Sequence, residues 1–126
     1  MTHSDPRTVI LVVEDEPFVR MVAVDSLEEG NRRVLEAGCA EEALAVIAAE
    51  GRIDLLFTDI NMPGELDGID LATIALDRQH DLKLIVTSGA KGMTAADIPD
   101  HGIFISKPYS TRALAQMVDE KLIAPR

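Results

Sequence analysis

Short apolar runs alternate with amphipathic helical patterns along almost the whole chain, and this alternation restricts the fold more strongly than any other feature. The run at positions 8–13 is continuous and rich in β-branched residues, and further strand patterns cover positions 33–37, 54–59, 83–88 and 102–106. Helical patterns cover positions 17–29, 40–50, 66–79 and 110–122, with a weak one at 94–98 before Pro99. Strands that are apolar on both faces need cover on both sides. We therefore predict an α/β protein with a doubly wound, five-stranded parallel sheet.

Residues with known positional preferences mark the ends of the predicted helices. Pro17 suits a first helical turn, because the missing N–H costs nothing there. Gly51 stops the second helix, and Ser110 is expected to cap the last one. In the first helix the apolar residues lie near helical spacing; they are Phe18, Met21, Val22, Val24 and Leu27.

Size and composition point to one domain, residues 1–126, with a polar tail at residues 1–7 and no output domain. The net charge of -10 comes without a cluster of Lys and Arg, so we expect no nucleic-acid partner. A single cysteine, Cys39, excludes an intrachain disulfide. We find no signal peptide and no apolar run long enough to span a membrane, and expect a cytoplasmic protein.

Polar side chains follow four of the predicted strands. Glu14 and Asp15 follow the first, Asp59 ends the third, Thr87 lies near the end of the fourth, and Lys107 follows the fifth. In a parallel sheet these ends share one edge, where ligands bind. Clustered carboxylates repel one another unless a cation joins them, and oxygen ligands favour Mg²⁺. The pattern predicts a Mg²⁺ site in which Asp59 is the nucleophile of phosphoryl transfer.

Each of these residues alone has an ordinary explanation. Asp59 could form a turn, the acids before Pro17 could start a helix, and Lys107 could be a solvated loop residue. Their joint occurrence on alternate strands favours the functional interpretation.

Four segments of the sequence resemble a known protein family. "VILVVEDE", "LLFTDINMPGELDG", "LIVTSG" and "FISKPY" resemble the response-regulator receiver domain, the phosphoacceptor of two-component signalling. The resemblance spans nearly the whole chain. It implies a flavodoxin-like fold with strand order 2-1-3-4-5.

The resemblance also implies a role for each matching position. Asp59 would be the phosphorylated residue, Glu14 and Asp15 would bind Mg²⁺, and Asn61 would bind it through its backbone carbonyl. Lys107 would hold the phosphoryl group, while Thr87 and Phe104 would form the switch. Pro108 occupies a position where the family often has a cis peptide bond.

Partners follow from the same resemblance. A sensor histidine kinase or a histidine phosphotransfer protein would supply the phosphoryl group. An unknown downstream protein would respond to changes on the face of the fourth strand, fifth strand and last helix. We expect a monomer or weak homodimer that is not an enzyme beyond catalysing its own phosphorylation and dephosphorylation.

Three positions depart from the family pattern. Glu14 replaces the commoner aspartate, and its greater length favours a metal contact through water. The loop Pro63–Gly68 is one residue longer than the usual form, and Gly89 lacks a side chain that could control water access.

Two other functions stay open at this point. One is a Mg²⁺-dependent aspartyl-phosphate phosphohydrolase, although Asn61 stands where such enzymes carry a general acid. The other is a receiver-like interaction module that works without phosphorylation, which the intact Asp59, Thr87 and Lys107 argue against.

Overall fold

A computed structural model describes residues 7–89, 98–99 and 102–123. One parallel sheet has the strand order β2-β1-β3-β4-β5, so the predicted fold and strand order are confirmed. The strands are β1 Val9–Val13, β2 Arg33–Ala37, β3 Leu55–Asp59, β4 Lys83–Ser88 and β5 Ile103–Ser106. The helices are α1 Pro17–Glu28, α2 Ala40–Glu50, α3 Gly68–Arg78 and α4 Thr111–Ile123.

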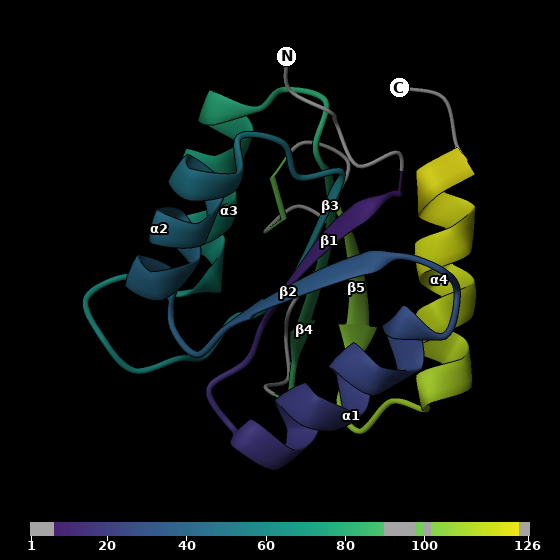
Figure 1. Ribbon diagram of the computed structural model, residues 1–126. Helices are drawn as coiled ribbons and strands as arrows, with labels where there is room; N and C mark the ends of the chain where they lie inside the picture. The colour runs from purple at the N-terminus through teal and green to yellow at the C-terminus, as the bar shows by residue number, and fades with distance from the viewer. Residues whose placement is uncertain (1–6, 90–97, 100–101, 124–126) are drawn as a thin grey trace.

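Helices cover both faces of the sheet, α2 and α3 on one face and α1 and α4 on the other (Figure 1). Strands β1 and β3 lie in the middle and are buried along their whole length, which explains their continuous apolar sequence. Strand β5 is an edge strand and is only partly buried. Two apolar clusters fill the two interfaces between the helices and the sheet.

Helix α3 begins at Gly68, two residues later than the apolar pattern predicts. Asp67 caps it: its side chain accepts a hydrogen bond from Asp70 N, and the Asp70 side chain accepts one from Asp67 N. A Cβ atom at Gly68 would lie 2.0 Å from the backbone oxygen of Asp59. Glycine therefore allows the start of α3 to pack directly against the end of β3.

The helical spacing of the apolar residues in α1 does not correspond to one buried stripe. Phe18, Met21 and Val22 are 70%, 50% and 36% exposed. The helix instead packs through Ala23, Val24 and Leu27. Helix α1 contacts α4 as well as strands β1 and β2, and these contacts determine which of its faces is buried.

Two sequence-based expectations fall largely outside the described residues. These are the weak helix at positions 94–98 and the N-terminal tail, of which only Ile98 and Arg7 are described. Ile98 is buried and packs in the cluster between the sheet and α2 and α3. The cap predicted for the last helix is present, since Ser110 Oγ accepts a hydrogen bond from Ala113 N at 3.0 Å.

Candidate functional site

Three carboxylates meet at the carboxyl edge of the sheet. Glu14, Asp15 and Asp59 each offer an oxygen, and these oxygens all lie within 4.8 Å of one another. Neighbouring strands β1 and β3 deliver them, because Val13 pairs with Thr58 one residue before the acids begin. Glu14 and Asp59 are 3% and 5% exposed, while Asp15 faces solvent.

Lys107 reaches into this group from the end of β5. Its Nζ atom donates to Glu14 Oε1 at 2.7 Å and to Asp59 Oδ2 at 3.0 Å. Partial burial alone would lower the pKa of Lys107, but the hydrogen bonds and negative charges of Glu14 and Asp59 outweigh it and raise that pKa. One ammonium group against three carboxylates leaves the site negatively charged.

The pKa of Asp15 reflects this excess negative charge. Its pKa is raised above the ordinary value, first by desolvation and then by a hydrogen bond to Glu14 and the charge of Glu14. A bound cation would remove this penalty. The donors are carboxylate oxygens from three residues, without His or Cys, and this set fits Mg²⁺.

Thr87 provides a second sign that a ligand fits here. In the β3–β4 register it lies directly opposite Asp59, and it is 1% exposed. Its Oγ1 atom is buried and has no hydrogen-bond partner within the described part of the chain. An unsatisfied buried hydroxyl costs about 1–3 kcal/mol. An oxygen of a group attached to Asp59 could accept this hydrogen bond.

Asn61 lies just beyond the end of β3 and is held from two directions. Its backbone N–H donates to Asp59 Oδ1 at 3.3 Å, and its side-chain Nδ2 donates to Ser88 Oγ at 2.9 Å. The amide side chain therefore has a partner on β4, and the backbone stays beside Asp59.

Phe104 is less closely connected to the acids. It lies on β5 opposite Val86, is partly buried, and packs against the cluster between the sheet and α2 and α3. The structure thus brings Glu14, Asp15, Asp59 and Lys107 into one group and puts Thr87 beside it in the sheet. Phe104 lies two strands away from Asp59.

Three contributors were not singled out as site residues in the sequence. Arg20 donates from Nη1 to the backbone oxygen of Glu14 at 2.8 Å and from Nε to Glu36 at 3.0 Å, which fixes the loop that carries the acid pair. Ser88 binds Asn61. Nothing in the local sequence marks Arg20, because its target is a backbone atom.

Tyr109 is the third contributor. It follows the cis peptide bond between Lys107 and Pro108, so the cis bond implied by the family resemblance is present. The Tyr109 ring packs edge-on against Phe57 with 5.6 Å between centroids. Burial, followed by the negative charge of Glu14, raises the pKa of its hydroxyl to about 12. In the sequence, its position two residues after Lys107 is the feature that could have identified Tyr109 as a neighbour of the site.

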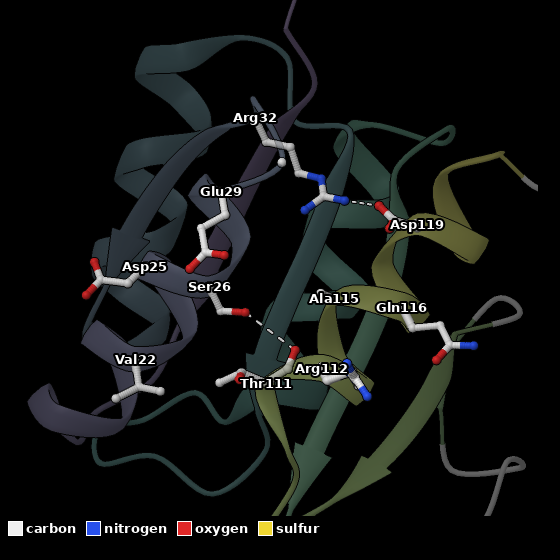
Figure 2. A pocket seen from close by; sticks show the side chains of 11 residues that line it. Val22, Asp25, Ser26, Glu29, Arg32, Thr111, Arg112, Ala115, Gln116 and Asp119 are labelled. Carbon is white, nitrogen blue, oxygen red and sulfur yellow. Dashed lines mark hydrogen bonds and ion pairs between the residues drawn. The ribbon is translucent and has the colours of Figure 1, made fainter.

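One hollow adjoins this site, and another lies away from it. One of about 470 Å³ adjoins it and is lined mostly by apolar side chains, among them Phe18, Val22, Pro108 and Tyr109 next to Lys107. The other, of about 750 Å³, lies between α1 and α4 and contains none of the three acids (Figure 2). It is crossed by an ion pair between Arg32 and Asp119 (Figure 2).

None of the helices in the described part of the chain combines the length and the apolarity needed to cross a membrane.

Comparison with known proteins gives relatives of one kind. Sensor kinase CckA of Brucella abortus (strain 2308) is 36% identical over 125 residues, which are 96% of this chain and 13% of the kinase. A crystal structure of the receiver domain from a hybrid histidine kinase CckA matches with a TM-score of 0.79 and 36% identity, covering 90% of this chain and 98% of that domain. Response regulator receiver protein CpdR of the same bacterium is 33% identical over 118 residues, 91% of this chain and 97% of CpdR.

A third relative was solved as a complex. Response regulator TrrA of Thermotoga maritima, in complex with Mg²⁺ and BeF, matches with a TM-score of 0.77 and 27% identity, covering 91% of this chain and 99% of TrrA. The family model for the response regulator receiver domain matches residues 10–119. With these matches added to the fold and the acid edge, the chain belongs to the response regulator receiver domain family of two-component systems.

Proposed function

We propose that this chain is the phosphoacceptor switch of a two-component phosphorelay and that Asp59 is phosphorylated in the presence of Mg²⁺. The observation that carries the proposal is the geometry around Asp59. This buried carboxylate has one oxygen on Lys107 Nζ, lies in a cluster of three acids, and is opposite the unsatisfied Thr87 hydroxyl. The relative TrrA, solved with Mg²⁺ and BeF, supports the metal.

The transfer uses Asp59 as the nucleophile. An Asp59 carboxylate oxygen forms a bond to phosphorus while the bond from phosphorus to the donor histidine nitrogen breaks, and that nitrogen keeps the electron pair. Lys107 stabilises the negative charge that moves onto the phosphoryl oxygens, and Thr87 donates its hydroxyl hydrogen to one of them. Bound Mg²⁺ would neutralise further charge, held by Asp15, Asp59 and the Asn61 carbonyl.

Glu14 takes a different part in this arrangement. Oε1 accepts from Lys107 Nζ and Oε2 accepts from Glu16 N at 3.2 Å, so both oxygens already have partners. This supports a metal contact through water for Glu14, with Asp15 as the direct ligand. The longer side chain spans the distance to Lys107 and holds the ammonium group beside Asp59.

The donor is proposed to be a protein, either a sensor histidine kinase or a histidine phosphotransfer protein. The rim next to Lys107 is apolar, with Phe18 70% exposed at the start of α1 and Pro108 and Tyr109 across the hollow. An exposed aromatic beside a charged site suits a protein surface that must bring a histidine to Asp59.

Phosphorylation would be read by a downstream protein on the face of β4, β5 and α4. The added negative charge draws Thr87 toward Asp59, and Phe104 adjusts on the neighbouring strand. No catalytic activity beyond phosphorylation and dephosphorylation of Asp59 belongs to the proposal. The hydrolase alternative has less support, because the Asn61 side chain cannot act as a general acid and is bound to Ser88.

Intact-mass measurement tests the proposal. The protein is incubated with a small phosphodonor, with Mg²⁺ or with a chelator, as wild type and as Asp59→Asn. We expect one phosphate adduct that requires Mg²⁺ and is absent from Asp59→Asn. An adduct that persists in Asp59→Asn, or its absence with every donor including cognate kinases, would contradict the proposal. Rapid multiple turnover of the donor would favour the hydrolase.

A further inference from the structure

The loop after the phosphoacceptor strand has few connections to the rest of the site. The β3–β4 ladder ends with Ile60 N donating to Thr87 O at 2.9 Å, and Gly68 N donates back to Ile60 O at 2.8 Å. Between these points, the described residues 61–66 make one hydrogen bond to another strand, from Asn61 Nδ2 to Ser88 Oγ at 2.9 Å. Apart from its backbone bond to Asp59, Asn61 is therefore held by Ser88.

Ser88 is well placed to fix this loop. It is the last residue of β4 and is 1% exposed. Its backbone oxygen accepts a hydrogen bond from Lys107 N at 3.1 Å. The same residue thus binds the Asn61 side chain through its hydroxyl and the Lys107 backbone through its carbonyl. A buried hydroxyl on a rigid strand end is a better anchor than a solvent-exposed one.

We propose that the Ser88 hydroxyl is a positioning group for Mg²⁺ binding, because it fixes Asn61 and so holds the Asn61 backbone carbonyl toward the acid cluster. The inference deepens the proposed function and rests on it. Ser88 itself would not contact the ion, because it acts through Asn61. Outer hydrogen-bond partners that orient a metal ligand commonly determine a substantial part of the metal affinity.

The bond has a second consequence for the switch. Ser88 directly follows Thr87, and Asn61 lies two residues after Asp59, so the bond joins the segment that would hold the metal to the strand that would respond to phosphorylation. Occupancy of the metal site and the position of the β4 end are therefore coupled through one pair of side chains.

A double-mutant cycle tests the inference with the full chain and with Mg²⁺ as the probe. The variants are Ser88→Ala, Asn61→Ala and the double variant, with Mg²⁺ affinity measured by isothermal titration calorimetry. Asn61→Ala keeps the backbone carbonyl and removes only the amide. Each single variant is expected to raise the Mg²⁺ dissociation constant about 5- to 10-fold, and the double variant no further.

Ser106→Ala is the matched control. Ser106 pairs with Ser88 in the β4–β5 register but is exposed and has no bond to Asn61, so its replacement should leave Mg²⁺ affinity unchanged within about two-fold. Cooperative thermal unfolding checks that every variant is folded. In nuclear magnetic resonance spectra, the Asn61 side-chain amide signal should shift in Ser88→Ala and not in Ser106→Ala.

The outcomes separate the inference from the function on which it rests. Wild-type affinity in a folded Ser88→Ala, or additive losses in the double variant, would overturn the positioning role and leave the proposed function standing. A wild type that binds no Mg²⁺ would overturn both. Mg²⁺ affinity close to that of the wild type in Ser88→Thr, which keeps a hydroxyl, would support the role further.

Discussion

The carboxyl edge of the sheet and the groove between α1 and α4 both contain several charged side chains, but these side chains differ in burial. The edge contains Glu14, Asp15, Asp59 and Lys107. The groove contains Asp25, Glu29, Arg32, Arg112 and Asp119, and its volume, about 750 Å³, is larger than that of the hollow beside Lys107.

Burial makes the difference between the two regions. At the edge, the side chains of Glu14 and Asp59 are 4% and 6% exposed, and both share Lys107. In the groove, the Arg32 side chain is 10% exposed, but that of its partner Asp119 is 61% exposed, so water screens the pair and it contributes at most about 1 kcal/mol. Uncompensated buried charge therefore identifies a binding site better than the size of a hollow does.

The largest effect should separate Asp15 from Asp25. Asp15→Asn removes a direct carboxylate ligand and is expected to raise the Mg²⁺ dissociation constant at least about 10-fold. Asp25→Asn makes the same chemical change in the groove, outside the group of Glu14, Asp15 and Asp59, and should stay within about two-fold. Calorimetric titration of both variants measures the difference. Equal losses would mean that overall charge, rather than the acid cluster, attracts the ion.

A smaller effect should separate Phe18 from Gln116. Phe18→Ala truncates the exposed aromatic beside the site and is expected to lower kcat/KM for transfer from a protein phosphodonor about 10-fold. Phosphorylation from a small phosphodonor should not change, because Phe18 is 70% exposed and the groups around Asp59 that would act on it are the acids and Lys107. Gln116→Ala, in the groove, serves as the control. Equal sensitivity of Gln116→Ala would place the donor on the groove instead.

The smallest effect concerns Tyr109 at the rim of the site. Its hydroxyl should titrate near pH 12, because burial and the charge of Glu14 raise the pKa to about 12. Since the unfolded chain loses this proton near pH 10, the free energy of unfolding should fall as the pH rises from about 10 to 12. With one Tyr and no Trp, ultraviolet absorbance follows this residue alone.

Variants at the two regions sharpen this last test. Glu14→Gln should lower the pKa of Tyr109, whereas Asp25→Asn in the groove should leave it in place. A wild-type titration near pH 10 would show that the ring is solvated and does not pack against Phe57.

The sequence determined much of the framework. The bounds of β2, α2 and β4 agree with the predicted ranges, because strand patterns, helical periodicity and a helix-ending glycine are local signals. The ends of the strands already placed Asp59, Thr87 and Lys107 at one edge, since parallel strands leave no other arrangement. The family resemblance supplied the strand order and the finer roles, such as those of Asn61 and Phe104.

Other features depended on tertiary structure. The helical period of α1 allowed Phe18 and Met21 to be buried, but the neighbouring α4 and the sheet selected Ala23, Val24 and Leu27 instead. Likewise, the sequence could place an acid or a serine at a strand end without fixing its partner. The Lys107 contact with Glu14 and the Asn61 contact with Ser88 join residues distant in sequence. Periodicity and turn signals act over a few residues, whereas burial and hydrogen-bond partners are decided when separate elements pack together.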